Sequence, residues 1–405
     1  MDAMALFLEE PDRALRQEAW ERIAARRLQD VDKVEEIFER LLDLRTRIAR
    51  NAGFEDYRDY AFRRLGRFDY SAADCLEFHA SIERTVVPAL KHLQARRSEQ
   101  LGLFPLRPWD GAVDPLGRPP LRPFKNVAGL VAGSQRVFDQ LDSGLGAGFQ
   151  LMQDQRLLDL ANREGKAPGG FQTALREARL PFIFMNAVGQ QRDVETILHE
   201  AGHAFHTLAA RERDLDAYRS APIEFCEVAS MSMELLGNEF IEEFYSPAEA
   251  RRARRKHLEG IVRILTWVPV VDAFQHWVYT HPGHSRTERS AEWIRLLDRF
   301  GDVDWSGLEE QRAASWHRVL HLFVVPFYFV EYGIAQLGAL QVWANSKRDK
   351  AGAMSDYKAA LALGGSRPLP ELFAAAGCRF RFDQATIAPL VEMLEAELRL
   401  LGHSQ

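Results

Sequence analysis

Apolar side chains recur at helical spacing along most of the chain, among many charged residues. We expect helices over residues 11–50, 71–100 and 126–163, and over long stretches from residue 192 onward. The segment 180–188 (LPFIFMNAV) differs, because it is a short apolar and aromatic run between Pro181 and Gly189, which favours a β-strand. Since such runs are few, the pattern predicts a mainly α fold with a minor β element.

A proline-rich segment interrupts the helical pattern. Residues 103–124 contain six prolines, which fix their own φ angles and cannot donate a backbone hydrogen bond. We therefore expect an extended, partly rigid connection here.

The composition is that of a globular protein with a sizeable core. Of the 405 residues, 46% are hydrophobic and 27% are charged, which excludes a mostly disordered chain and a collagen-like repeat. A net charge of -6 gives no general attraction to nucleic acid, so none is expected as a partner. The three scattered cysteines suit a reducing compartment better than a disulfide framework.

The sequence predicts neither export nor a membrane span. The start, MDAMALFLEE, lacks the basic residues and the long apolar run of a signal peptide. The best candidate span, residues 319–343, contains His321, Glu331 and Gln336 and a central Pro326. A buried helix of a large soluble protein is the favoured interpretation, and we expect a cytoplasmic protein.

The strongest chemical signal is the HExxH motif of residues 199–203 (HEAGH), inside a strongly helical stretch. Residues i and i+4 share one helical face, so His199 and His203 can offer two imidazoles to one metal ion. Glu200 lies beside that face and can take a proton from a metal-bound water. Two imidazoles and a carboxylate, with one open position, suit zinc. Chance gives only about 0.03 such motifs in this composition, which favours a site over two coincidental histidines.

A third ligand is expected from the helical segment 222–245, which follows the motif. Its acids Glu224, Glu227 and Glu234 lie near one face at offsets i, i+3 and i+10. Any of the three could ligate on spacing alone, and all three could instead be solvated or paired acids.

The segments ETILHEAGHAFH and IEFCEVASMSMELL resemble the zinc oligopeptidases of the thimet oligopeptidase and oligoendopeptidase F family, peptidase family M3. In that family a glutamate of a second helix, a little under thirty residues after the HExxH motif, is the third ligand. The resemblance implies one zinc ion per chain, held by His199, His203 and Glu227, with Glu200 as general base. It extends over most of the chain, and PFIFMN and LALGGSRPLPELF are similar to the oligoendopeptidase F branch.

The resemblance also implies a fold and a substrate class. It implies a large multi-helix metallopeptidase fold, with a small antiparallel β element beside the active-site helix, and oligopeptides as substrates. We expect an N-terminal helical region over 1–125 and a helical zinc-peptidase region over 126–405. Family members are usually longer, with a further N-terminal helical lobe, so we expect the first region to be truncated relative to the family. The oligomeric state is not predicted.

A further group lies in the apolar segment 319–343. If this segment is one helix, His321, Tyr328 and Tyr332 at i, i+7 and i+11 return to within about 20° of one direction. Spacing alone favours a core helix whose hydroxyls bond backbone carbonyls. The resemblance instead implies that these side chains bind the substrate carbonyl oxygen and the oxyanion, where a donor contributes about 2.7–4 kcal/mol.

Two other functions stay open at this point. A zinc carboxypeptidase on a related helical fold would need a positive group for the free C-terminus of its substrate. A non-catalytic peptide-binding protein would result if the shorter N-terminal region disables turnover. Among weaker features, Cys226 is expected to be a small buried core residue. The strand candidate 180–188 could serve as the edge against which a peptide pairs, or could be an interior strand.

Overall fold

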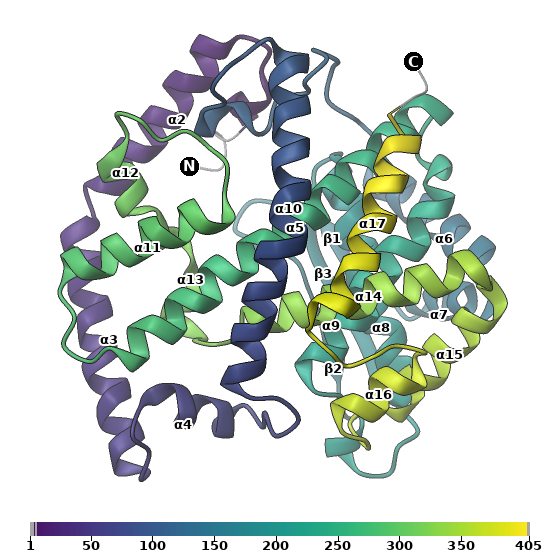
Figure 1. Cartoon of the computed structure of the whole chain (residues 1–405). Helices are drawn as coiled ribbons and strands as arrows, with labels where there is room; N and C mark the ends of the chain where they lie inside the picture. The colour runs from purple at the N-terminus through teal and green to yellow at the C-terminus, as the bar shows by residue number, and fades with distance from the viewer. Residues whose placement is uncertain (1–3, 5, 403–405) are drawn as a thin grey trace. The chain divides into compact units, whose positions relative to one another are not determined.

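The computed structural model describes residue 4 and residues 6–402 (Figure 1). Residues 1–3 and 5, which belong to the segment considered for a signal peptide, lie outside the described residues. Contacts divide the chain into two units. Unit 1 comprises residues 1–120, 262–330 and 382–384, and unit 2 comprises 121–261, 331–381 and 385–405. The division expected from the sequence at 125/126 stays a prediction.

Unit 1 is built from helices around a core of aromatic side chains. Its elements are η1 (Leu6–Glu9), α2 (Arg13–Leu28), α3 (Val31–Asn51), α4 (Tyr57–Arg64), α5 (Ala72–Leu101), η2 (Pro108–Asp110), the second half of α10 (Pro247–Thr280), α11 (Arg286–Phe300), α12 (Glu309–Ala313), η5 (Ser315–Arg318) and α13 (Leu320–Val324). The fully buried Phe274 of α10 contacts Trp293 and Trp316 edge-on or at a tilt, with ring centroids 5.0 and 5.6 Å away. These rings bury large apolar areas, so they hold the helices of this unit together.

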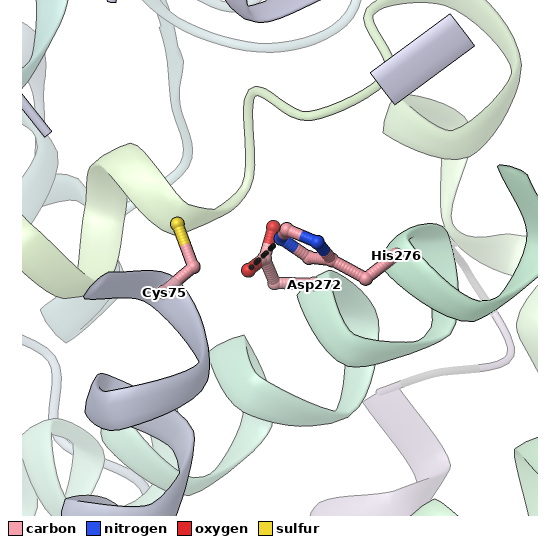
Figure 2. Close-up of side chains that lie close together, drawn as sticks. All are labelled: Cys75, Asp272 and His276. Carbon is pink, nitrogen blue, oxygen red and sulfur yellow. Dashed lines mark ion pairs between the residues drawn. The ribbon is translucent and has the colours of Figure 1, made fainter. Parts of the chain in front are cut away.

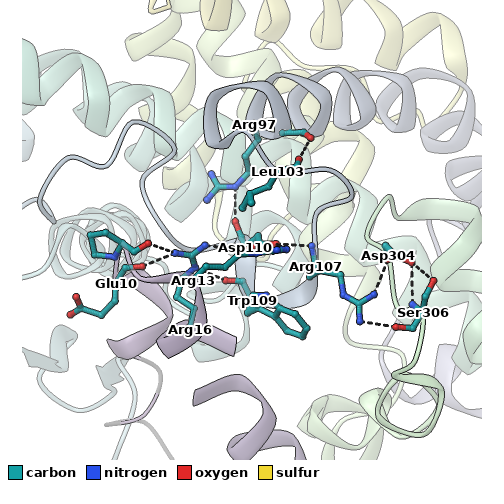
Figure 3. Close-up of polar contacts among 12 residues, drawn as sticks. Glu10, Arg13, Arg16, Arg97, Leu103, Arg107, Trp109, Asp110, Asp304 and Ser306 are labelled. Carbon is teal, nitrogen blue, oxygen red and sulfur yellow. Dashed lines mark hydrogen bonds and ion pairs between the residues drawn. The ribbon is translucent and has the colours of Figure 1, made fainter. Parts of the chain in front are cut away.

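The proline-rich segment is held in place by a buried carboxylate (Figure 3). Apart from η2 it is not helical, as the sequence predicts. Asp110 is fully buried and accepts hydrogen bonds from Arg13 (2.8 Å) and Arg16 (3.1 Å) of α2. Its backbone carbonyl accepts another from Arg97 of α5, at 2.9 Å. Burial alone would raise the pKa of Asp110, but the bonds from Arg13 and its other donors lower it, so the carboxylate stays charged.

Unit 2 carries the HExxH motif. Its elements are α6 (Val127–Leu141), α7 (Ser143–Asp154), β1 (Leu158–Ala161), β2 (Phe171–Leu175), β3 (Leu180–Ala187), α8 (Gln191–Ala210), η3 (Asp216–Tyr218), α9 (Ile223–Gly237), η4 (Asn238–Glu243), the first half of α10, α14 (Val330–Arg348), α15 (Lys350–Leu363), α16 (Leu369–Ala375) and α17 (Gln384–Leu400). Helix α8 packs against α9, β3 and α15. The motif therefore lies on a helix enclosed by other elements.

The strands of the described residues form one three-stranded sheet in the order β1-β3-β2. β3 pairs antiparallel with β2 and parallel with β1, so the sheet is mixed and not purely antiparallel as expected. The predicted strand at 180–188 and the mainly α fold class are confirmed. Of the two alternatives for this segment, the interior strand is confirmed and the peptide-binding edge is wrong, because β3 is paired on both sides. β2 is an edge strand of this sheet instead.

Two helical predictions are corrected. The pattern over 126–163 ends early, because β1 follows α7. The apolar segment 319–343 is not one helix: α13 ends at Val324, and Phe327 has a left-handed φ of 67° before α14 begins. The common direction inferred for His321, Tyr328 and Tyr332 from continuous helical offsets is therefore wrong. Within the described part of the chain, every helix is too short or too polar to cross a membrane.

Candidate metal centre

Helix α8 is anchored at its start by a carboxylate and along its length by apolar side chains. Asp193 accepts hydrogen bonds from the backbone N–H groups of Val188 (2.8 Å) and Gln190 (2.9 Å), which otherwise have no helical partner. Ile197 and Ala201 are fully buried on one side of the helix. Cap and burial together fix the direction in which the motif's side chains point.

Gly202 allows the neighbouring helix to approach closely. A Cβ atom at this position would lie 2.6 Å from Cα of Ser230 and 2.7 Å from the carbonyl oxygen of Ala229, both on α9. Only glycine fits this crossing without a shift of backbone. The crossing places Glu227, one turn before Ser230, beside the two histidines.

The three expected ligands meet at one point. Glu227 Oε2 is 3.4 Å from Nε2 of His199 and 3.7 Å from Nε2 of His203. Nitrogen or oxygen ligands about 2.0–2.2 Å from a tetrahedral zinc lie about 3.3–3.6 Å apart. One ligand atom from each residue lies within 4.8 Å of the others. The separations and the donor types fit a zinc ion.

The other side of His199 is held by an acid. Its Nδ1 lies 2.6 Å from Glu234 Oε1, and the second oxygen of Glu234 lies 3.0 Å from Nε2 of His257. Burial alone would raise the pKa of Glu234, but these two imidazoles lower it to about 2. The charged Glu234 orients the His199 ring so that Nε2 faces Glu227, which is the usual support of a metal-binding histidine.

The electrostatic environment favours a cation. Burial alone would lower the pKa of His199, but Glu227 and Glu234 raise it well above its usual value. Burial lowers the pKa of His203 to about 4, which keeps this imidazole neutral and able to ligate. Burial would also raise the pKa of Glu227, but His199 lowers it on balance. Glu227 beside the two imidazoles and Glu234 behind His199 thus make this position attractive to positive charge.

Glu200 differs from the other acids. It is 7% exposed, and burial raises its pKa to about 7. The backbone N–H of Gln172, on edge strand β2, bonds its carboxylate and partly opposes that rise. The Gln172 side chain also donates to Thr207 of α8 at 3.2 Å. A carboxyl group whose pKa lies near neutrality is suited to both taking and giving a proton.

The structure distinguishes the three acids that spacing left open. Glu227 lies within the ligand group, and Glu234 stands behind His199 as its hydrogen-bond acceptor. Glu224 is buried on the same helix, outside that group. The thiol of Cys226 donates to the Ala221 carbonyl at 3.4 Å, and burial raises its pKa to about 12. Cys226 is partly exposed and not fully buried as expected, and its raised pKa disfavours the thiolate that a nucleophile needs.

The three side chains expected to contact the substrate, His321, Tyr328 and Tyr332, are divided between the two units. His321 and Tyr328 belong to unit 1, with ring centroids 5.7 Å apart, and Tyr332 belongs to unit 2. Phe327 between them is fixed in its left-handed conformation by two partners, since Gln275 accepts its N–H at 2.5 Å and Arg67 donates to its carbonyl. The roles of these three side chains in catalysis stay predictions.

A pocket beside His203 is lined by four arginines. Arg176, Arg179, Arg211 and Arg219 line it together with Gln172, His206 and one acid, Asp216. Asp216 pairs with Arg176 at 2.9 Å. The guanidinium groups outnumber the carboxylate, so the pocket attracts anions. The sequence alone did not reveal this pocket, because two of its arginines come from the turn between β2 and β3 and two from the segment after α8.

Comparison with solved structures relates this fold to peptidases. The chain aligns with PZ peptidase A solved with an inhibitor at 30% identity and a TM-score of 0.92, covering 98% of this chain and 71% of that one. A structure assigned to oligoendopeptidase F gives 32% identity and a TM-score of 0.90, covering 99% and 71%. This is the helical peptidase class that the HExxH helix and its partner helix α9 suggested.

The chain belongs to peptidase family M3, whose model matches residues 6–391. It is similar to the oligoendopeptidase F homolog of Borreliella burgdorferi, at 22% identity over 227 residues, and to oligopeptidase PepF of Bacillus subtilis, at 22% over 228. The matched regions span 38% and 34% of those two proteins. The resemblance to the oligoendopeptidase F branch is confirmed, and the family supports a peptidase function.

Proposed function

We propose that this protein is a zinc-dependent endopeptidase that hydrolyses oligopeptides. In this proposal His199, His203 and Glu227 hold one zinc ion per chain, and Glu200 is the general base. The observation that carries it is the meeting of two imidazole nitrogens and a carboxylate oxygen at tetrahedral ligand separations. When bound, zinc would lower the pKa of a coordinated water and polarise the substrate carbonyl.

Proton transfer belongs to Glu200. Its carboxylate takes the proton of the attacking water and then gives it to the nitrogen of the leaving amine. The environment supports both steps, because burial raises its pKa to about 7 while the Gln172 N–H stabilises the charged form.

Peptide binding is assigned to the edge of β2. An extended peptide adds to a sheet edge through backbone hydrogen bonds, so binding does not demand a particular sequence. β2 pairs with β3 on one side, and the backbone N–H of Gln172 in β2 donates a hydrogen bond to the carboxylate of Glu200. A peptide along this edge would lie beside the proposed base.

Tyr328 and Tyr332 are assigned to the substrate. Their hydroxyls are proposed to donate to the carbonyl oxygen as it gains negative charge, with His321 as a further donor. Each such donor typically contributes about 2.7–4 kcal/mol to the transition state.

The test combines metal analysis with a peptide assay. Purified protein should contain zinc and cleave a quenched fluorescent peptide, and a chelator should abolish cleavage. Glu200→Gln should retain zinc and lose about 10²–10⁴-fold in rate. The control Glu212→Gln, an exposed acid just after α8, should change neither property. Full activity of Glu200→Gln would remove Glu200 from the mechanism. Near-normal zinc in Glu227→Ala would move the third ligand to Glu224 or Glu234.

A carboxypeptidase is the second candidate, and the arginine-lined pocket favours it. A pocket that attracts anions beside His203 could hold the free C-terminus of a peptide. The two functions separate on one peptide prepared with a free and an amidated C-terminus. An endopeptidase cleaves both at the same internal bond, whereas a carboxypeptidase loses activity on the amide.

A further inference from the structure

Unit 1 contains a second group of metal-ligand side chains, supplied by two helices. Cys75 and His79 lie at i and i+4 on α5, and Asp272 and His276 lie at i and i+4 on α10. One ligand atom each from Cys75, Asp272 and His276 lies within 4.8 Å of the others (Figure 2). Each helix therefore presents two donors on one face, as the HExxH helix does.

The group is closed to solvent. Asp272 is fully buried, and Cys75, His79 and His276 are at most 5% exposed. Phe62 and Phe327 stand edge-on to the His276 ring, at centroid distances of 6.0 and 5.4 Å. This closed, apolar surrounding is typical of structural metal sites.

Several polar atoms of this group lack a hydrogen-bond partner among the described residues. Asp272 Oδ2 is 2.8 Å from Nε2 of His79, yet Asp272 Oδ1 and His79 Nδ1 have none. His276 has none at either ring nitrogen, although its Nε2 lies 3.3 Å from Asp272 Oδ2. Unsatisfied buried groups cost about 1–3 kcal/mol each, so their concentration at one place points to an unseen ligand.

Charge balance indicates what that ligand is. A divalent cation would balance the two negative charges of a Cys75 thiolate and the Asp272 carboxylate. Sulfur, nitrogen and oxygen donors together suit zinc, whereas magnesium and calcium prefer oxygen alone.

We propose that Cys75, Asp272 and His276 bind a second zinc ion, which has a structural role in unit 1. Binding releases the Cys75 thiol proton to solvent, and His79 holds the Asp272 carboxylate through its Nε2 hydrogen bond. The ion joins α5 to α10, so its binding free energy contributes to folding. This inference does not depend on the proposed catalytic centre.

The test first removes the catalytic ion. In the double variant His199→Ala/His203→Ala, metal analysis should still find one zinc per chain, against two in the unchanged protein. Zinc replaced by cobalt(II) in the double variant should give a thiolate-to-cobalt charge-transfer band, because Cys75 is the sulfur ligand. A strong chelator should remove this ion and lower the melting temperature.

Matched cysteine variants assign the band. Cys75→Ser in the double-variant background should lose it, whereas Cys378→Ser should keep it, because the buried Cys378 thiol bonds carbonyls of unit 2. One zinc in the unchanged protein and none in the double variant would overturn the proposal and leave the catalytic site intact. The same zinc contents are expected if a buried water, and not a metal ion, binds these side chains. If Cys75→Ser does not fold, the zinc contents of the unchanged protein and of the double variant still test the proposal.

Discussion

The close crossing of α8 and α9 at Gly202 makes a sharp prediction for Gly202→Ala. The added Cβ would lie 2.6 Å from Ser230 Cα, whereas carbon atoms in contact lie about 3.5–4.0 Å apart. The obstacle is backbone, which cannot rotate away as a side chain can. The two helices must therefore separate by about 1 Å at this point.

That separation reaches the proposed metal ligands. Glu227 is one turn from Ser230, which donates to the Glu227 carboxylate at 3.1 Å. A shift of about 1 Å would carry Glu227 Oε2 from its 3.4 Å distance to His199 well beyond a tetrahedral ligand separation. Metal sites tolerate only about 0.2 Å in their bond lengths. We expect a loss of at least about tenfold in zinc affinity. Overpacking should also cost about 1–3 kcal/mol of unfolding free energy.

The assays are zinc competition against a chromophoric chelator and urea unfolding. Gly260→Ala is the matched control, since a Cβ there meets no atom within 4 Å and Gly260 lies inside helix α10. It should leave zinc affinity unchanged and stabilise the protein by about 0.5–1 kcal/mol. Wild-type zinc affinity in Gly202→Ala would refute the reasoning that this glycine sets the position of the third ligand.

Three further predictions follow from the same contacts. Glu234→Gln removes the charged acceptor behind His199 and should lower zinc affinity about 10–100-fold in the same competition assay. Tyr328→Phe and Tyr332→Phe should each lower kcat about 10²–10³-fold in the peptide assay; unchanged kcat in either variant would remove that hydroxyl from catalysis. Asp110→Asn leaves the buried guanidinium of Arg16 without its charged partner and should cost about 3–5 kcal/mol in urea unfolding. Because the pKa of Asp110 is lowered on folding, its contribution is present above the unfolded pKa of about 3.9 and is lost as pH falls; an unchanged pH dependence in the variant would contradict this.

The sequence predicted the parts of the site that follow from helical periodicity. His199 and His203 share a face because they are four residues apart, and this holds for any α-helix. Glu227 could be chosen among three acids only through the family resemblance, because spacing within one helix cannot show how that helix crosses another. Gly202 carries that information, and its lack of a side chain is the signal that could have revealed the crossing.

The errors arise where contacts distant in sequence override local preference. The segment 319–343 is apolar enough for one helix, yet Arg67 and Gln275 bond both backbone groups of Phe327 and hold it in a left-handed conformation. Neither partner lies within fifty residues of it in sequence. Pro326 was the local signal of a break. Likewise, the pattern of 180–187 identifies a strand but does not show which strands pair with it. In the structure β1 pairs on one side of it and β2 on the other.

Exposure assigns different roles to the two proposed metal sites. Both use donors at i and i+4 on helices, so spacing alone cannot separate them. The side chains of His199 and His203 are 24% and 16% exposed, which lets a substrate reach an ion between them. Asp272 and Cys75 are 0% and 1% exposed, so an ion there is inaccessible to peptide. A catalytic ion needs an open coordination position and a structural ion does not, and the surroundings of each helix pair therefore determine what the same pattern does.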